Sequence, residues 1–426
     1  MLIRYLFLGW IIVLFFTPSL QGQSGQDKKV KTIYFEGLKR TKAPFLRQFL
    51  QTKVGQTLQE SLVQTDVQRL KNIAGIGNAT AHLDTFPSGI QLVFHIDEVR
   101  TLLPILNFGG IEGNVWFQVG FSDINWQGKG QFLSAAYQNN DRRHSGNIYY
   151  KVPRISGTNW GFTASLNKWS SREPLFFDEG TVNYEYDNNG IGLTAIRHFG
   201  LLKYLEIGGT YFVEEYSQSS QQFLENPPGP IQFSQPKWLS KFSYSEDYLN
   251  YHYFYLQGFQ WQALLQDVFN TVDRTWFHSL LIQAKYFKRI GEKGNLAGRT
   301  RFGIATNNDS PFAPFVVDSH VNIRGVGNRI DRGTAQLIVN TEYRHTYFEN
   351  KKIAVQAVGF SDAGTWRNPG GELKDLFDKQ QFRVFIGGGF RLIYQKIYGA
   401  VLRVDYGIDV FNTQERGFVI GLGQYF

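Results

Sequence analysis

The stretch Ala400-Val-Leu-Arg-Val-Asp-Tyr-Gly-Ile-Asp-Val410 alternates between two kinds of side chain. On a β-strand, one face would carry its apolar and aromatic residues, Leu402, Val404, Tyr406, Ile408 and Val410. The opposite face would carry Arg403, Asp405, Gly407 and Asp409. A soluble sandwich buries the apolar face of such a strand, whereas a membrane barrel turns that face toward lipid. The alternation therefore predicts a β-strand and leaves both folds open.

Similar segments of about ten residues recur from residue 115 to the end of the chain, separated by turns rich in Gly, Asn and Asp. We predict about sixteen strands, an even number as in bacterial single-chain barrels. The predicted strands are 115–124, 130–138, 145–154, 160–170, 181–186, 190–198, 203–215, 237–247, 251–265, 275–288, 296–306, 334–347, 353–361, 382–393, 398–408 and 417–426. Long connections such as 216–236, 307–333 and 362–381 follow odd-numbered strands, and those after even-numbered strands are mostly short. Short turns at one end and long loops at the other are typical of outer-membrane barrels, which supports this register.

The composition favours a membrane barrel over a soluble β-protein, which is the alternative. The 426 residues include 44 Gly, 37 Phe, 22 Tyr and 9 Trp. A mean hydropathy of −0.28 is too polar for a bundle of membrane helices. The chain has no cysteine, which excludes disulfides, thiol catalysis and a lipoprotein anchor. The net charge of +8 comes from scattered basic residues that form no stripe, so we expect no nucleic-acid partner.

The amino terminus has the pattern of a secretory signal. Arg4 precedes an apolar run over residues 5–16, and small and polar residues follow. The run is shorter than the roughly 20 residues that a spanning helix needs. We predict a signal peptide over residues 1–22, cleaved near Gly22, with a retained anchor as the alternative.

Residues 28–100 read as a small β-α-α-β-β domain. Its predicted elements are a strand over 30–37, helices over 44–50 and 58–73, and a hairpin of strands over 79–86 and 90–99. We expect Thr41 to cap the first helix. A small mixed sheet leaves an edge strand to which an extended polypeptide can add. The alternative is a structural plug or spacer below the barrel.

The chain ends in Gly417-Phe-Val-Ile-Gly-Leu-Gly-Gln-Tyr-Phe426, which we predict to be the last strand. A terminal aromatic residue on such a strand is the usual carboxy-terminal signal of outer-membrane barrels, and Phe426 occupies that place. Gly417, Gly421 and Gly423 are expected to weaken the lateral seam between the first and last strands, because glycine-rich strands pack poorly.

The long connection at about 307–333 contains Arg324-Gly325, and two acidic positions follow, one on the next predicted strand and one at the end of the strand after it. These are Glu342 and Asp362, the second within Asp362-Ala-Gly364. A guanidinium forms forked hydrogen bonds with carboxylates that lysine cannot reproduce. An exposed loop arginine with unrelated acids is the alternative.

In that order, these motifs resemble the superfamily of outer-membrane assembly and two-partner-secretion barrels, the BamA- and TamA-like or bacterial surface antigen family. The resemblance implies that the loop folds back into the barrel and that Arg324 and Gly325 are anchored by Glu342, Asp362 and Gly364. With Phe35-Glu-Gly37 and Ile96-Asp-Glu-Val99, residues 28–100 look like one POTRA (polypeptide-transport-associated) domain. The barrel, residues 105–426, would then lie in the bacterial outer membrane with the POTRA domain in the periplasm. The family usually has an aromatic residue directly after Arg-Gly, where this chain has Val326, and its essential assembly factors carry several POTRA domains. These differences imply a reduced or specialised member.

The resemblance implies a protein insertase or translocase that receives unfolded or extended polypeptide clients, contacts outer-membrane lipids and has lipoproteins or other assembly subunits as further partners. A passive pore and a structural subunit of a larger complex are the alternatives. We expect no enzyme, no cofactor and no metal, because the 8 histidines are dispersed and no nucleophile elbow or phosphate loop is present. A Ser/His/Asp site assembled only in space stays open.

Overall fold

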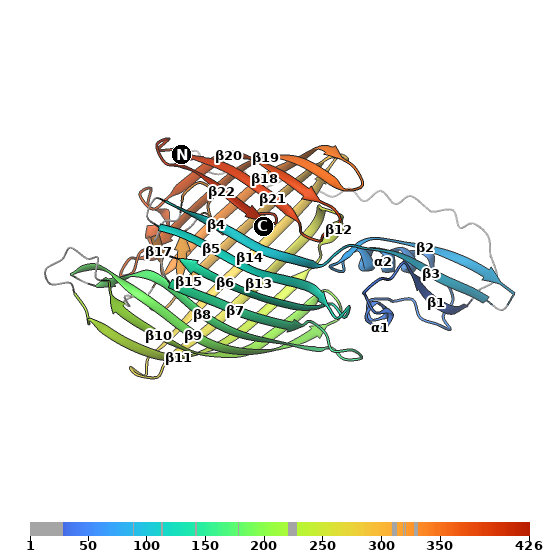
Figure 1. Cartoon of the computed structure of the whole chain (residues 1–426), viewed down its shortest axis with the longest axis horizontal. Coiled ribbons are helices and arrows are strands. Elements are labelled where there is room, and N and C mark those ends of the chain that lie inside the picture. Colours follow the sequence, from blue (N-terminus) through green and yellow to red (C-terminus); the bar gives the residue numbers. More distant parts are fainter. Residues whose placement is uncertain are drawn as a thin grey trace, which may run out of the picture.

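The computed structural model describes residues 29–426 except 88, 112–113, 141–142, 178, 220–227, 309–312, 318, 320 and 328–330. The predicted signal segment, residues 1–22, lies outside the described residues. The described chain forms a large β-barrel with a small α/β domain at one of its ends (Figure 1). We call the barrel end that meets this domain the domain end, and the opposite one the far end.

The small domain has the predicted β-α-α-β-β order. Its elements are β1 (Val30–Glu36), α1 (Ala43–Arg47), α2 (Glu60–Lys71), β2 (Ile76–Phe86) and β3 (Gly89–Glu98). β3 is the central strand, parallel to β1 and antiparallel to β2, so β2 forms one edge of the sheet. α2 covers the sheet with Val63, Val67 and Leu70. Asp66 on the same buried face accepts backbone hydrogen bonds from Gln51 and Thr52, at 2.7 and 2.9 Å, which satisfies its carboxylate.

The barrel is closed and antiparallel. Its strands in the described part of the chain are β4 (Leu102–Ile111), β5 (Asn114–Trp126), β6 (Gln131–Asn140), β7 (Arg143–Val152), β8 (Trp160–Phe177), β9 (Gly180–Phe199), β10 (Lys203–Gln218), β11 (Gln232–Asp247), β12 (Asn250–His252), β13 (Tyr255–Asn270), β14 (Trp276–Ile290), β15 (Gly294–Ala305), β18 (Ala335–Glu349), β19 (Ile353–Arg367), β20 (Arg383–Tyr394), β21 (Val401–Asp409) and β22 (Arg416–Leu422). β12 has three residues and pairs with the first residues of β13. The rest of β13 pairs directly with β11, so β12 is not counted as a strand of the wall. The other sixteen described strands form the wall, which closes where β22 meets β4.

The predicted number of strands agrees with the wall only because two errors cancel. The first strand, β4, lies before the first predicted strand at 115–124. The predicted strands 181–186 and 190–198 are halves of one 20-residue strand, β9. Asn188, Asn189 and Gly190 suggested a turn, yet they pair continuously with both neighbouring strands. From β10 onward each wall strand has the ordinal number that we predicted.

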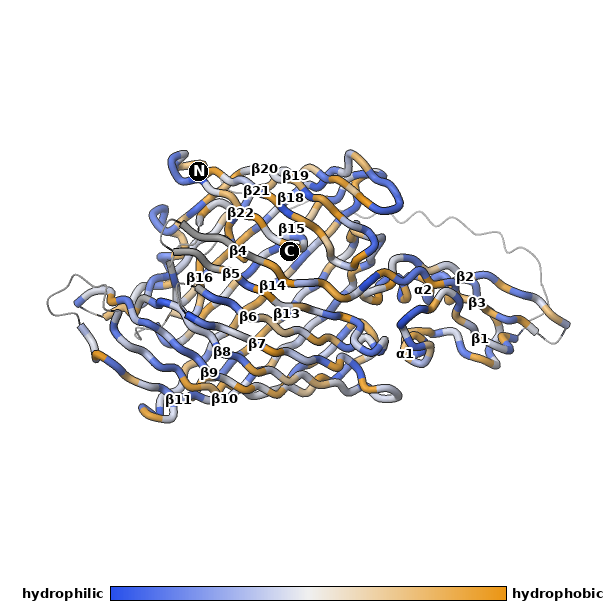
Figure 2. The backbone as a smooth tube through the Cα atoms, in the orientation of Figure 1, coloured by the Kyte–Doolittle hydropathy of each residue, from blue (hydrophilic) through white to orange (hydrophobic). Residues whose placement is uncertain are grey.

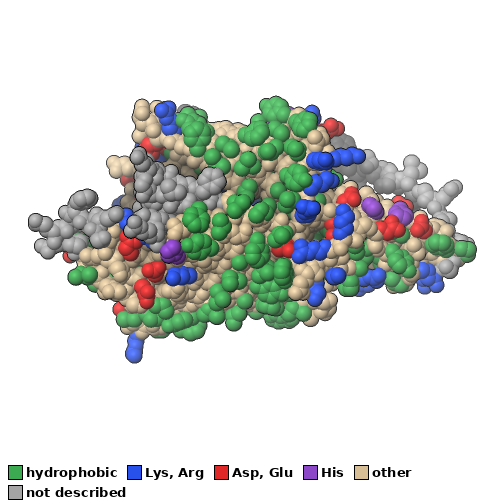
Figure 3. Space-filling view, viewed as in Figure 1, with side chains coloured by type: hydrophobic (Ala, Val, Ile, Leu, Met, Phe, Trp, Pro, Cys, Tyr) green, Lys and Arg blue, Asp and Glu red, His purple; other side chains and the backbone are tan. Residues whose placement is uncertain are grey.

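The direction in which side chains are buried shows that the barrel has a membrane-type surface. In β21 the charged Asp405 is 0% exposed, whereas Leu402 is 43% exposed. Apolar and polar residues alternate along the barrel strands in Figure 2, and hydrophobic side chains spread over the outer surface in Figure 3. Lys and Arg side chains gather where the barrel meets the domain (Figure 3). This inside-out burial is expected of a barrel surrounded by lipid. None of the described helices is long and apolar enough to cross a membrane.

The α/β domain is fixed to the barrel by the last residues of β5. Arg40 forms an ion pair with Asp123 at 2.6 Å, and Thr101 donates a hydrogen bond to the same carboxylate at 2.7 Å. Thr41 does not cap α1, whose N-cap residue is Lys42. Instead, its hydroxyl accepts a hydrogen bond from Asn125 at 2.9 Å across this joint.

Two further contacts complete the joint, one made by β12 and one by a turn. Asn72, at the end of α2, donates from its amide to Asn250 at 3.1 Å and accepts from the backbone of Tyr251 at 3.0 Å. The backbone of Arg100 pairs with Lys396 and Tyr398 in the turn between β20 and β21, at 3.0 and 2.8 Å. The end of β5, the short strand β12 and the turn between β20 and β21 therefore hold the domain in one orientation.

Gly128 offers a test of this joint. It has φ +72°, and a Cβ atom there would lie 2.0 Å from the carbonyl oxygen of Arg40. Gly157, in the turn between β7 and β8, has φ +76°, and an added Cβ atom would have nothing within 4 Å. We predict that Gly128→Ala releases the domain, whereas Gly157→Ala, which carries the same backbone strain of roughly 1–3 kcal/mol, leaves it docked.

The measurement is the rate at which a short bismaleimide cross-links cysteines introduced at Lys71 of α2 and His252 of β12, which lie across the joint and make none of its hydrogen bonds named above, in a chain that has no other cysteine. We expect a severalfold lower rate in Gly128→Ala alone, with the folded electrophoretic mobility of the barrel unchanged. Equal rates in both variants would contradict the role of this contact.

Candidate functional site

The connection between β15 and β18 folds into the barrel lumen. It spans residues 306–334 and contains a small hairpin of β16 (Phe315–Val317) and β17 (Asp331–Gly333). Arg324 lies in the segment between these two strands and is 0% exposed. In the order of the wall strands the loop lies between the eleventh and the twelfth, as the sequence predicted.

Arg324 is held by both predicted carboxylates. Its Nε and Nη2 atoms donate to the two oxygens of Asp362, at 2.8 and 2.9 Å, in a forked pair. Its backbone N–H also donates to Asp362, at 2.9 Å, and its Nη1 donates to Glu342. Glu342 lies on β18 and Asp362 on β19, and both are buried. One guanidinium thus joins the loop to two neighbouring strands.

The network extends to residues that the sequence alone did not single out. Glu342 also accepts from Arg344, and Asp405 accepts two hydrogen bonds from Arg391, at 2.7 and 3.1 Å. Asp405 lies 3.8 Å from Nη1 of Arg324. The alternation along β21 does predict that Asp405 faces the lumen. It does not show which basic residue will pair with Asp405 there. Arg391 lies on β20, so four consecutive strands contribute to one buried cluster.

The guanidinium of Arg324 lies over two aromatic rings. The ring centre of Phe360 lies 3.7 Å from the Arg324 guanidinium carbon, and that of Tyr425 lies 4.4 Å away. A desolvated cation over aromatic faces gains up to about 2 kcal/mol. The Tyr425 hydroxyl also donates to the backbone oxygen of Ser319 at 3.0 Å, which ties the chain terminus to the loop.

Glycines let the loop backbone approach the wall. Gly325 has φ +94°, and a Cβ there would lie 2.7 Å from the carbonyl oxygen of Gly407 on β21. A Cβ on Gly417 would lie 2.9 Å from the carbonyl oxygen of Gly325. Gly364, on β19, leaves room for Ile323, whose Cδ1 would be 2.6 Å from an added Cβ. These three glycines explain how an inserted loop can lie directly against the wall.

Val326 stands where the resemblance drawn from the sequence implies an aromatic residue. It packs in a buried apolar cluster with Val317, Ile323, Ile338, Trp366 and Phe385. Polar contacts add to this anchor: Arg299 donates twice to Asn340, at 2.9 and 2.7 Å, and Asn340 donates to the backbone oxygen of Asn322 at 2.7 Å. The part of the loop around Arg324 is therefore held by apolar and polar contacts on both sides of Val326.

The chain terminus corrects one prediction. We placed the last strand over 417–426 with Phe426 at its end, but β22 ends at Leu422. Gly423 has φ +87° and turns the last residues into the lumen. Phe426 packs on Phe287 there, and its carbonyl oxygen accepts a hydrogen bond from Arg344 at 3.2 Å. We call residues 423–426 the lumen tail. A left-handed turn at a single glycine is what separates this arrangement from a continued strand.

The three glycines assigned to the seam therefore have luminal or turn positions. Gly417 receives the loop, Gly423 starts the lumen tail, and an added Cβ at Gly421 would lie 2.9 Å from Nη2 of Arg403. Their expected weakening of the contact between β22 and β4 stays a prediction.

We predict that Arg324→Lys destabilises the barrel by about 2–3 kcal/mol, because lysine keeps the charge but loses the fork to Asp362. The free energy of unfolding would be measured by urea titration, and loop exposure by limited proteolysis with chymotrypsin. The matched control is Arg274→Lys, the same substitution at an exposed position in the turn between β13 and β14. If both variants unfold at the same urea concentration, the buried contacts of Arg324 carry no stability.

We predict that Tyr425→Ala shifts the unfolding midpoint to lower urea, by an amount equivalent to about 1–2 kcal/mol, because Arg324 loses one aromatic face. Tyr425→Phe keeps the ring but loses the hydroxyl that donates to Ser319, so its midpoint should lie between those of the parent and Tyr425→Ala. Indistinguishable midpoints for the alanine variant and the parent would show that the lumen tail does not stabilise the loop.

Comparison with known proteins agrees with this geometry. Residues 28–98 match the POTRA family, described as a surface antigen variable number repeat. The chain resembles the structure of BamA from Haemophilus ducreyi lacking POTRA domains 1–3, with 15% identity, a TM-score of 0.54, and coverage of 93% of this chain and 84% of that one. It also resembles CdiB from Acinetobacter baumannii (14% identity, TM-score 0.56, coverage 93% and 74%) and CdiB from Escherichia coli (10%, 0.54, 94% and 75%). Residues 28–98 therefore form a POTRA domain, and the chain as a whole has the fold of these POTRA-bearing β-barrels.

Proposed function

We propose that this protein inserts polypeptides into the outer membrane or moves them across it, with its POTRA domain on the periplasmic side. The observation that carries the proposal is the position of the POTRA domain at the point where the barrel closes. Arg100, between β3 and β4, pairs with the turn that leads into β21, and β21 pairs with β22. The domain is thus held beside the junction of β22 and β4.

The edge strand β2 supplies the receiving surface in this proposal. An extended client can pair with the backbone of an edge strand, and such pairing tolerates many client sequences. No step requires a catalytic residue or a cofactor. The energy would come from the client itself, since strands that enter lipid must satisfy their backbone hydrogen bonds and gain by burying apolar surface.

The luminal loop and the lumen tail distinguish this proposal from a passive pore. Both occupy the interior, and Arg324 joins them to β18 and β19 through buried contacts. A wide, steadily open channel has no need of an element fixed across its interior. A structural subunit that holds lipoproteins is the remaining alternative, and it predicts that a luminal change has no effect on clients.

The test uses Arg324→Ala, with the exposed Arg274→Ala as its control. We expect Arg324→Ala to lower the amount of other barrels or secreted proteins that are assembled, while its own barrel still reaches the membrane and shows folded mobility. The measurement is quantitative proteomics of outer-membrane and secreted fractions, beside a deletion strain.

Unchanged client levels in both the deletion strain and Arg324→Ala would contradict the proposal. A large, steady conductance in planar bilayers that persists when residues 28–100 are removed would favour the pore instead.

A further inference from the structure

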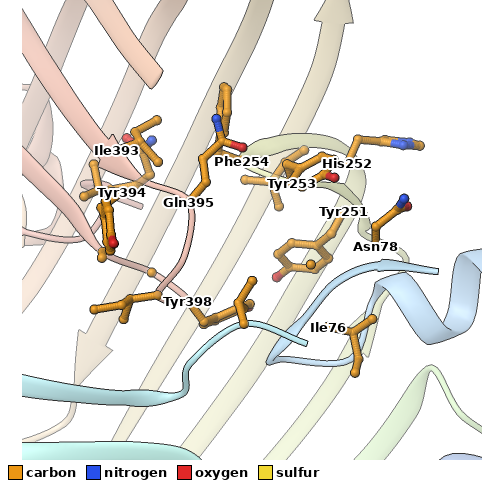
Figure 4. A pocket seen from close by; sticks show the side chains of 18 of the residues that line it. Ile76, Asn78, Tyr251, His252, Tyr253, Phe254, Ile393, Tyr394, Gln395 and Tyr398 are labelled. Atoms are coloured by element: carbon orange, nitrogen blue, oxygen red, sulfur yellow. The ribbon is translucent and has the colours of Figure 1, made fainter. Parts of the chain in front are cut away.

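A pocket of about 280 Å³ lies where the POTRA domain meets the barrel. From the POTRA domain its walls include Lys71 at the end of α2, the start of β2, and Val99. From the barrel they include the segment from β12 to β13, the segment from β20 to β21, and the start of the lumen tail. Figure 4 shows Tyr251 and Tyr253 on one side, Tyr394 and Tyr398 on the other, and Ile76 of the POTRA domain nearby. We call this cavity the junction pocket.

Several aromatic rings line the junction pocket. Tyr251, Phe254 and Tyr398 are all partly exposed and face the cavity from two different turns. Burial raises the pKa of the Tyr398 hydroxyl, so this group remains a protonated hydrogen-bond donor at neutral pH. Burial, with help from Arg289 and Lys71, lowers the pKa of His252, so its imidazole is neutral at pH 7.

We propose that the junction pocket binds one aromatic side chain of an extended polypeptide client. The inference rests on the proposed function and deepens it. The edge of β2 would recognise the backbone of a client, and the pocket would add a preference for one kind of client side chain. Aromatic rings pack on one another with a gain of about 0.5–1.5 kcal/mol beyond area burial.

The dimensions fit this occupant. An apolar cavity of about 150 Å³ is enough to hold a benzene molecule, so about 280 Å³ holds a ring together with the peptide unit that carries it. Ile76, Gly77 and Asn78 line the pocket and begin β2, so a client strand paired along β2 would run into the pocket. Gly423 and Gln424 line its other side directly after β22. The pocket therefore lies between the receiving edge and the strand at which the barrel closes.

The walls of the pocket are largely uncharged, which suits an aromatic ring. Among the described residues that line the pocket, Lys71 alone has a formal charge at neutral pH, and none is Asp or Glu. Asp247 and Asp97 lie close enough to act on the wall tyrosines, so charges of both signs surround the pocket. A lipid chain fits this site less well, since one wall belongs to the POTRA domain and four tyrosines place hydroxyl groups around it.

The test compares two labelled peptides of alternating Thr and Val, one with Phe and the other with Ala at the centre. Binding to the full chain in phospholipid nanodiscs would be measured by fluorescence anisotropy. We expect the Phe peptide to bind about tenfold more tightly, and this advantage to disappear in Tyr398→Ala, which removes a wall, and in Ala400→Phe, which fills the space.

Tyr347→Ala is the matched control, because Tyr347 is an aromatic residue at the same end of the barrel, 68% exposed and outside the pocket. It should keep the advantage of the Phe peptide. Tyr398→Phe should keep it as well, which separates loss of the ring from loss of folding, and folded mobility would be checked for every variant.

Equal affinity for the two peptides, or an advantage that survives both Tyr398→Ala and Ala400→Phe, would overturn the inference. So would labelling of Tyr251 or Tyr398 by a photoactivatable phospholipid in the nanodisc, which would place an acyl chain in the pocket. None of these results depends on the Arg324→Ala measurement of client levels, so the inference can fail while the proposed function stands.

Discussion

The structure depends on the cost of burying the Arg324 guanidinium. A cation at zero exposure is tolerated only where carboxylates and hydrogen bonds replace its water, and leaving such a charge unpaired costs roughly 3–5 kcal/mol. Asp362 satisfies one edge of the guanidinium by a forked pair, and Glu342 satisfies another. Because these acids lie on neighbouring strands, the loop has one position in which the charge is compensated. That electrostatic requirement fixes a long connection that could otherwise adopt many conformations.

Close backbone packing makes that position possible. The loop can place its charge between β19 and β21 only if its backbone touches the wall, and Gly325 and Gly407 permit this contact. Alanine at either position would meet carbonyl oxygen well inside van der Waals distance. The electrostatic and steric conditions therefore act together: the carboxylates select the loop conformation, and the glycines provide the space for it.

The sequence predicted those parts that follow from local alternation or from paired motifs. The POTRA element order, the ordinal place of the loop and the contact of Arg324 with Glu342 and Asp362 could all be predicted. β4 was missed because Pro104 and the glycines near its end suggest a boundary, although a proline is tolerated in a strand beside a seam. The division of β9 came from Asn-Asn-Gly, a turn signal that two paired neighbours override. Asp405 and the inward turn at Gly423 depend on contacts distant in sequence, which no local pattern reveals.

The lumen tail connects the two sites that the fold creates. Gly423 and Gln424 line the junction pocket, and the next residue, Tyr425, covers Arg324. Gln424 also accepts a hydrogen bond from Arg391 at 3.1 Å, and Arg391 holds Asp405 within the charge cluster. A displacement of this segment at the pocket must therefore break a contact to Arg391 or move the ring from Arg324. If the lumen tail had two positions, a change from one to the other would alter both the junction pocket and the contacts of Arg324. The tail is therefore a physical route by which a client bound at the pocket could affect the barrel interior.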